Sequence, residues 1–96
     1  MEKLHARKPG LRLRLYIAGN APNSVSAATN ARAICEEFFH SRYELEVVDM
    51  LEEPHRALAD EIIVTPTLLR LLPTPIQRII GDLSDREQVL IVLGDE

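Results

Sequence analysis

The residue types that perform chemistry are few in this sequence and are scattered along it. Cys35 is the only cysteine, so neither an intramolecular disulfide nor a Cys-x-x-Cys pair can form. His5, His40 and His55 lack the spacing of metal ligands, and the sequence contains no glycine-rich phosphate loop and no Ser/His/Asp arrangement. Cys35 also falls on the apolar stripe of a predicted helix, where a buried and unreactive thiol is expected. These features predict a binding protein without a cofactor or metal rather than an enzyme; a thiol enzyme that uses Cys35 is the alternative.

The composition is that of one globular domain. The 96 residues are 46% hydrophobic and 27% charged, with a formal net charge of −4. This charge, and the presence of only two Tyr, two Phe and no Trp, argue against nucleic-acid binding. No apolar run approaches the roughly 20 residues of a membrane span, and residues 1–10 lack the apolar core of a secretory signal. We therefore expect a cytoplasmic protein with no nucleic-acid or membrane partner, a flexible leader over residues 1–10 and one domain over residues 11–96.

The first half of the domain is predicted to form a parallel β-α-β unit. Apolar and polar residues alternate in Leu11–Ala18 and again in Tyr43–Met50, as in half-buried strands. Asn23 or Ser24 can cap a helix between them that runs to about Phe39. The apolar stripe of this helix is predicted to comprise Val25, Ala28, Ala31, Cys35 and Phe38, with Ile34 and Phe39 widening it.

A short helix and a locally acidic segment follow. Glu52–Glu61 has Pro54 in its first turn and acidic residues at its start, and both features favour a helix N-terminus. Arg56 is the only Lys or Arg between Glu44 and Glu61.

Residues 62–93 permit two incompatible predictions. In the first, Ile62–Leu69 and Pro75–Ile80 are strands, and a helix follows in which Ser84 is the N-cap and Glu87 occupies the third helical position. Periodicity does not separate a short buried strand from a buried helical segment.

The second prediction exchanges the strands and the helix. Leu68–Leu72 and Ile76–Ile80 become short helices, and Gln88–Leu93 becomes a strand, because its residues favour β-structure. The prolines of this region limit both arrangements. Pro66 in a β-like run indicates an edge, a bulge or a cis bond, which costs about 0.5–1 kcal/mol before proline.

Three segments resemble the signature segments of the KaiB family of circadian clock proteins, namely Tyr16–Val25, Thr65–Leu68 and Arg78–Glu87. The resemblance extends from about Leu11 to Leu93. It implies an α/β domain that exchanges between an oligomeric ground-state fold, β-α-β-β-α-α-β, and a monomeric thioredoxin-like fold, β-α-β-α-β-β-α. The strand–strand–helix prediction for residues 62–93 corresponds to the thioredoxin-like fold, and the helix–helix–strand prediction corresponds to the ground state.

The resemblance also implies a function. The thioredoxin-like form is expected to bind a KaiC-type ATPase ring and then to recruit KaiA or displace a sensor histidine kinase, whereas the ground state is expected to be a tetramer or dimer. The residues expected to bind the ring are Arg32, Arg70 and Arg78. The residues expected to govern fold switching and proline isomerisation are Pro66, Pro73, Pro75, Val92 and Gly94. The segment at residues 19–24 corresponds to the Cys-x-x-Cys position of thioredoxins but has no cysteine, so redox activity is not expected.

Some positions depart from the family pattern. Family members carry many lysines on the face that meets KaiC, whereas the matching residues here are Ser26, Thr29, Glu46, Glu53 and Glu61. Because charge complementarity governs partner choice, the alternative function is a stress or signalling adaptor that acts on a kinase or another partner without a circadian role. Val92 stands where the family has a glycine and favours β-structure, so the ground-state order β-α-β-β-α-α-β is the one we favour.

Overall fold

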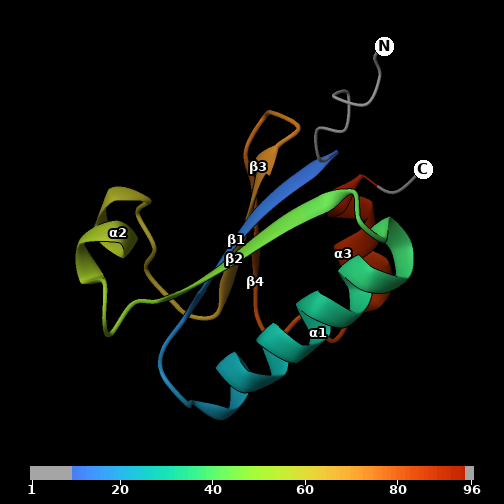
Figure 1. The fold of residues 1–96 in the computed structure, drawn as a ribbon. Coiled ribbons are helices and arrows are strands. Elements are labelled where there is room, and N and C mark those ends of the chain that lie inside the picture. The colour runs from blue at the N-terminus through green and yellow to red at the C-terminus, as the bar shows by residue number, and fades with distance from the viewer. Residues whose placement is uncertain (1–9, 95–96) are drawn as a thin grey trace.

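The computed structural model describes residues 10–94, which form a mixed sheet with helices on both of its faces (Figure 1). The predicted leader lies, apart from Gly10, outside the described residues. The α/β class is confirmed. In chain order the elements are β1 (Leu11–Ile17), α1 (Pro22–Phe39), β2 (Tyr43–Asp49), α2 (Pro54–Ala59), β3 (Thr67–Leu72), β4 (Gln77–Ile80) and α3 (Arg86–Leu93).

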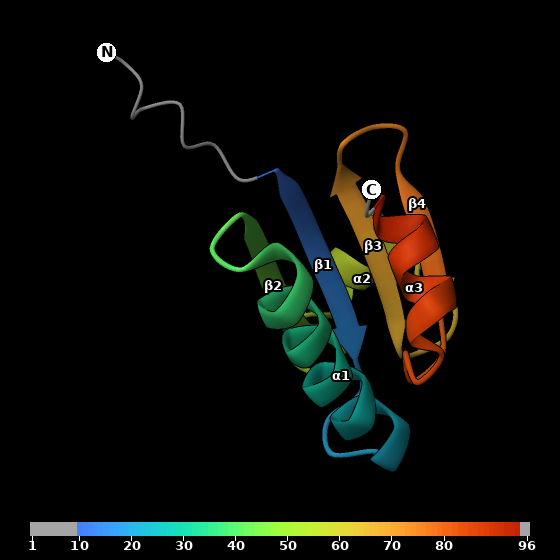
Figure 2. The same cartoon turned by 90° about the vertical axis from the view of Figure 1, so that its right-hand side faces the viewer.

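The sheet has the strand order β2-β1-β3-β4. β1 and β2 are parallel, as a β-α-β unit requires, and β3 and β4 form an antiparallel hairpin that joins the sheet beside β1. Figure 2 shows α1 and α3 in front of the sheet and α2 behind it. β2 and β4 are therefore the two edge strands, and α2 is the only helix on its face within residues 10–94.

The order of the second half corrects the arrangement that we favoured. Residues 62–94 adopt the strand–strand–helix arrangement, so the element order is the alternative, thioredoxin-like one. Val89 and Leu93 become buried when α3 forms, and Gly94 ends α3 with a φ of 84°, which glycine adopts without a steric cost. These tertiary and capping contributions outweigh the β-propensity of Val92, which lies in the last turn of the helix.

Several predicted boundaries were also wrong. β3 begins at Thr67 rather than Ile62, and β4 begins at Gln77 rather than Pro75, because the prolines lie in the preceding loops. α2 is confined to Pro54–Ala59. The N-cap of α3 is Asp85 rather than Ser84, since the Asp85 carboxylate accepts a hydrogen bond from the Gln88 N–H at 3.2 Å.

The start of α1 differs from the prediction in a similar way. Pro22 occupies the first turn, and no side chain caps the helix. The Ser24 hydroxyl instead accepts a hydrogen bond from the Ala18 N–H, at 3.0 Å. Val25 is 51% exposed and Phe38 is 36% exposed, so the predicted stripe is rotated about the helix axis. The buried face comprises Ser24, Ala27, Ala31, Ile34 and Cys35.

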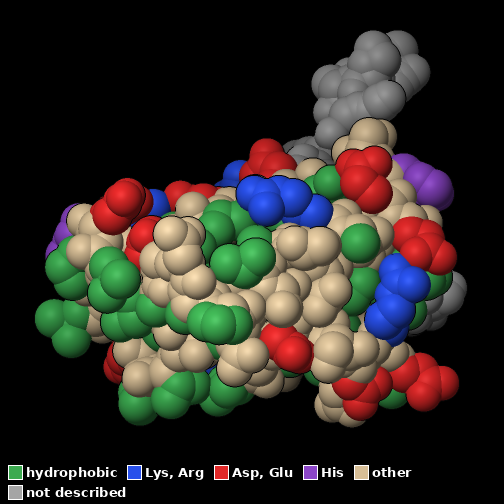
Figure 3. Space-filling model, turned by 90° about the horizontal axis from the view of Figure 1, so that it is seen from below, with side chains coloured by type: hydrophobic (Ala, Val, Ile, Leu, Met, Phe, Trp, Pro, Cys, Tyr) green, Lys and Arg blue, Asp and Glu red, His purple; other side chains and the backbone are tan. Residues whose placement is uncertain are grey.

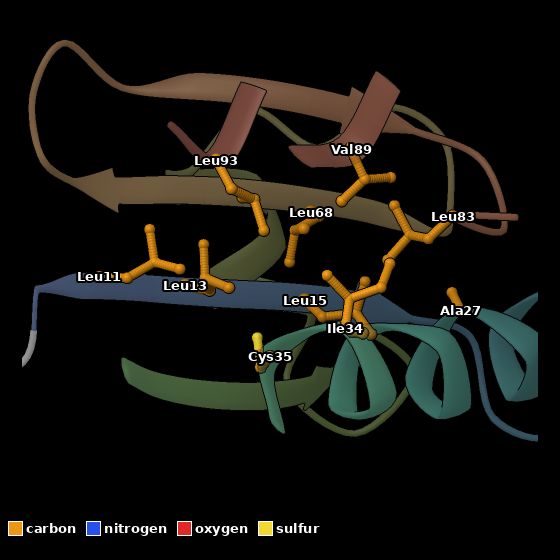
Figure 4. Close-up of a cluster of buried hydrophobic side chains, with 11 residues drawn as sticks. Leu11, Leu13, Leu15, Ala27, Ile34, Cys35, Leu68, Leu83, Val89 and Leu93 are labelled. Atoms are coloured by element: carbon orange, nitrogen blue, oxygen red, sulfur yellow. The ribbon is translucent and has the colours of Figure 1, made fainter. Parts of the chain in front are cut away.

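Two apolar clusters lie on opposite faces of the sheet. The larger one fills the space between the sheet, α1 and α3, as Figure 4 shows, and combines strand leucines with Ile34, Leu83, Val89 and Leu93. The smaller one lies beneath α2 and comprises Tyr16, Val48, Ala57, Ile62 and Leu69. Because Ala57 is the only member of this cluster that belongs to α2, the helix has a small apolar contact with the sheet, and polar contacts contribute to holding it.

Three peptide bonds that precede prolines are cis, namely Thr65–Pro66, Leu72–Pro73 and Thr74–Pro75. The cis bond before Pro66 is one of the arrangements that the sequence predicted. Within residues 10–94, no helix combines the length and the apolar composition needed to cross a membrane.

Candidate partner-binding surface

A hollow lies between the end of α2 and the edge strand β4. We call it the β4 hollow, and its lining residues are Glu61, Ile63, Val64, Thr67, Arg78 and Ile80. Ile63 is 90% exposed and Ile80 is 65% exposed, so large apolar side chains face solvent here. Figure 3 shows hydrophobic side chains at the surface towards the α2 end of the molecule. Exposed apolar groups of this kind, beside an unpaired strand edge, are typical of a protein-binding surface.

Arg78 fixes one wall of the β4 hollow. Its guanidinium donates hydrogen bonds to the backbone carbonyls of Asp60 at 2.8 Å and Glu61 at 3.3 Å. These carbonyls follow the last turn of α2 and have no partner within that helix, so Arg78 supplies one. The guanidinium of Arg78 therefore lies beside the apolar side chains of the hollow, which Glu61 also lines.

Arg70 lies on the opposite face of the sheet. Its side chain donates to the Val92 carbonyl at the end of α3 and to the Pro75 carbonyl in the β3–β4 turn, each at 2.8 Å. Its Nε atom is buried and makes no hydrogen bond within residues 10–94. These contacts assign Arg70 a structural role in joining α3 to the hairpin.

Arg32 is exposed on α1, which packs against β1 and β2. Arg78 is on β4 at the other edge of the sheet. The structure therefore does not gather Arg32, Arg70 and Arg78 into one patch, and of the three only Arg78 lines the β4 hollow.

Two of the acidic residues that depart from the family pattern are neutralised by arginines. Glu46 contacts Arg14 at 2.9 Å and Arg56 at 2.7 Å, and Glu53 lies 3.5 Å from Arg56. The hydrogen bonds from Arg56 and Arg14 lower the pKa of Glu46 to about 2. Glu61 differs because it lines the β4 hollow, where its carboxylate can meet a partner.

Cys35 lies on the buried face of α1. Burial, and then the charge of Glu36, raises the pKa of its thiol to about 11, so the thiol is protonated at neutral pH. A nucleophilic role requires an accessible thiolate, which this environment does not supply.

Comparison with known proteins establishes the family. A family model described as the KaiB domain matches residues 14–94. The circadian clock oscillator protein KaiB of Prochlorococcus marinus (strain MIT 9313) is 56% identical over 81 residues, covering 84% of this chain and 68% of that protein. The chain belongs to the KaiB family. The corresponding protein of Prochlorococcus marinus (strain NATL2A) is 52% identical over 90 residues, covering 94% of this KaiB-family chain and 83% of the relative.

Solved structures show which fold the chain shares. The N-terminal domain of Synechococcus elongatus SasA superposes with a TM-score of 0.75 at 22% identity, covering all of this chain and 93% of that domain. Chloroplastic thioredoxin z superposes with a TM-score of 0.75 at 20% identity, covering 93% of this chain and 80% of that one. At such identities the likeness concerns the fold alone, and it identifies the fold as thioredoxin-like.

The residues expected to govern switching lie at element boundaries of this KaiB-family chain. Pro66 immediately precedes β3, and Pro73 and Pro75 lie in the β3–β4 turn. The Val92 carbonyl accepts from Arg70, and the Gly94 N–H bonds back to the last turn of α3.

The sequence did not identify the apolar part of the β4 hollow. Ile63 and Val64 were assigned to a buried strand, because they continue the apolar run that begins at Ile62. Ile62 is buried, whereas Ile63 is almost fully exposed. The only signal was Pro66, which could have ended the run before β3.

Proposed function

We propose that this chain is a non-enzymatic clock regulator that binds a KaiC-type ATPase ring through the β4 hollow. The observation that supports the proposal most is the exposure of Ile63, Val64 and Ile80 around Arg78, at the open edge of the sheet. Burying such side chains against a partner would remove apolar surface from water, which favours a complex.

The finer parts of the proposal follow the family. The thioredoxin-like order is the binding form in the cytoplasm, and it forms from a tetramer or dimer that has the ground-state order. Slow exchange between the two delays binding, and the bound form recruits KaiA or displaces a sensor histidine kinase as negative feedback. Pro66, Pro73, Pro75, Val92 and Gly94 are the residues through which the exchange would operate.

Native mass spectrometry with a KaiC-type ATPase from the same organism, incubated with ATP for a day, tests the proposal. The expected result is a stable complex, and the free chain measured beside it reports the monomer and any dimer or tetramer. If no complex forms after this incubation, the clock-type role is wrong.

Two variants locate the surface. Ile63→Ser should weaken binding because Ile63 is 90% exposed and its loss leaves the folded core unchanged. Val25→Ser is the matched control, since Val25 is a 51% exposed apolar residue on α1, away from β4. Equal binding of both variants would exclude the β4 hollow. Arg78→Glu should also weaken binding, but it removes the contacts to Asp60 and Glu61 as well.

Glu61 supports a second candidate function. Its carboxylate lines the β4 hollow at a position where the family resemblance leads us to expect lysine. An acid there would favour a partner with a basic surface, such as a kinase or another signalling protein outside a clock. Glu61→Lys distinguishes the two candidates, because it should strengthen binding to the KaiC-type ring if that ring is the partner and weaken binding to a basic partner.

A further inference from the structure

A polar cluster connects α2 to the face of the sheet beneath it. We call it the α2 cluster, and it comprises Arg14 and Tyr16 of β1, Glu46 of β2, and Arg56 and Asp60 at the end of α2. The Tyr16 side chain is fully buried. Its hydroxyl oxygen lies 2.6 Å from Asp60 Oδ2 and 3.0 Å from the Arg56 carbonyl oxygen. The single hydroxyl proton is donated to the carboxylate, since that bond is shorter and charge-assisted.

The remaining contacts close a circuit between two strands and the helix. Arg14 Nη1 lies 2.9 Å from the same Asp60 oxygen, and Arg14 Nε lies 2.9 Å from Glu46 Oε1. Arg56 Nη1 completes the circuit, 2.7 Å from Glu46 Oε2. Two further groups face the cluster: Glu53 lies 3.5 Å from Arg56, and Arg78 of β4 donates to the Asp60 carbonyl. Every charge in the circuit therefore has an opposite charge within contact distance.

The protonation states keep the circuit intact at neutral pH. Burial, and then the bond to Asp60, raises the pKa of Tyr16 to about 12, so its hydroxyl retains the proton that it donates. Burial opposes ionisation of Asp60, but the bonds from Tyr16 and Arg14 outweigh it and lower the pKa of Asp60. Asp60 is therefore an acceptor for both neighbours.

The members of the α2 cluster come from two different parts of the chain. Arg14, Tyr16 and Glu46 belong to β1 and β2, which both predicted orders share. Arg56 and Asp60 belong to the segment after Met50, where the two orders diverge. α2 has only six residues, and a helix of this length is not stable by itself. Its apolar anchor is small, since Ala57 is its only buried residue.

We propose that the α2 cluster is a latch through which β1 and β2 hold α2 against the sheet and so favour the β-α-β-α-β-β-α order in the free chain. The preference for this order over another rests on the proposed function, because that function supplies the competing order. The docking of α2 itself does not depend on that function. Because only the competent order binds a partner, the latch would set the apparent affinity of the chain.

The chain contains a matched control for the buried hydroxyl. Tyr43 OH donates to Glu36 Oε2 at 2.6 Å, the same distance as in the Tyr16–Asp60 bond. This bond joins β2 to α1 and therefore lies wholly within the shared half. Tyr16→Phe and Tyr43→Phe remove the same group at the same bond length, and only the first touches α2.

Amide hydrogen exchange of the free, full-length chain tests the latch. The reporters are the Asp60 and Ile62 amides, which bond to the carbonyls of Arg56 at 3.1 Å and Ala57 at 2.9 Å. Tyr16→Phe should reduce their protection about tenfold to a hundredfold, the loss expected for a charge-assisted hydrogen bond, and Tyr43→Phe should leave it unchanged. A second pair of variants repeats the comparison. Asp60→Asn should also reduce the protection of these amides, and its control Glu44→Gln should leave the protection unchanged.

Two results would overturn the latch. One is equal protection of Asp60 and Ile62 in wild type and Tyr16→Phe, or an equal loss in Tyr43→Phe. The other is a wild-type chain in which both amides are unprotected. Partner binding is measured separately on the same variants. Loss of protection in Tyr16→Phe without any wild-type complex would leave the docking of α2 by the cluster standing and reject the proposed function. A wild-type complex, together with equal amide protection in Tyr16→Phe and Tyr43→Phe, would support the proposed function and reject the latch.

Discussion

The arginines that lie on strands make different bonds in the two halves of the chain. In residues 10–50, Arg12 and Arg14 each pair with a glutamate directly across the parallel strands, at 2.9 Å in both cases. In residues 51–94, Arg70 and Arg78 instead donate to backbone carbonyls at helix ends and in a turn. A cross-strand ion pair needs only that two strands be adjacent. A bond to a helix-terminal carbonyl needs that particular helix to exist.

The difference shows how one half can be independent of the other's arrangement. β1 and β2 are paired along their whole length, and α1 covers them. The second half adds α2 on one face of this unit and α3 on the other. The bonds of its strand arginines need the helices of the present order, because Arg70 meets the end of α3 and Arg78 meets the end of α2. The first half is therefore a template, and the contacts at helix ends join the second half to it in the present order.

The largest expected effect comes from damage to the template itself. Leu15 is fully buried in the cluster that joins β1 to α1 and α3, and Leu15→Ala should cost about 2–5 kcal/mol of unfolding free energy. Urea unfolding followed by circular dichroism measures this loss. Leu58→Ala is the control, since Leu58 is 79% exposed and its change should stay within about 0.5 kcal/mol. Separate transitions for the two halves in Leu15→Ala would contradict their common core.

A smaller effect, restricted to the second half, is expected at Arg70. Arg70→Met removes the bonds to the carbonyls of Val92 and Pro75, at a cost of about 1–3 kcal/mol. The lower end is expected, because the substitution also removes the buried Nε atom that has no partner within residues 10–94. Amide exchange should increase in α3 and the β3–β4 turn and stay constant in α1. The control is Arg32→Met, an equivalent change on the exposed side of α1, and a uniform increase over all elements would refute a local role.

The same contrast explains what could be predicted from the sequence. The alternation in residues 11–17 and 43–49 sets the strands, because one face of each strand meets α1 and the other meets water or α2. The apolar run at Ile62–Val64 carried no comparable information. Its three side chains do not share an environment, and only Ile62 enters a core.

The order of residues 62–94 depended on contacts that sequence patterns do not contain. Val92 has a strand-like propensity, but its conformation is set by the burial of Val89 and Leu93 and by the turn at Gly94. The β4 hollow was not predicted for a related reason. Arg32, Arg70 and Arg78 were grouped from the family resemblance, whereas in the structure Arg70 bonds to the end of α3, Arg78 bonds to the end of α2 and Arg32 is exposed on α1. The Asp60 carboxylate could not be matched to Tyr16 before α2 was positioned.

Acid should loosen α2 before it affects the template. The bonds from Arg56 and Arg14 lower the pKa of Glu46 from 4.5 to about 2, and the pKa of Asp60 is also lowered. Since the folded state binds fewer protons than the unfolded state in this range, the contribution of Glu46 is complete above about pH 4.5 and is lost as the pH falls towards 2. Protection of the Ile62 amide should therefore decline over this window faster than that of amides in α1. A Glu46→Gln variant should show a shallower decline, and an equal slope in both proteins would remove Glu46 as the cause.

The smallest effect is expected where an ion pair belongs to the template alone. Arg12 and Glu44 are paired at 2.9 Å, as Arg14 and Glu46 are, but both side chains are 52% exposed and neither touches α2. Exposed pairs contribute about 0.2–1 kcal/mol, since solvent screens the charges and the long side chains lose entropy. Glu44→Gln should therefore change the urea midpoint only slightly, and raising the salt concentration should abolish the difference. Glu46→Gln should destabilise the chain more, because Glu46 also holds Arg56 of α2. Equal effects of the two substitutions would mean that the cross-strand pairs alone matter, and that the second half gains nothing from the circuit around Asp60.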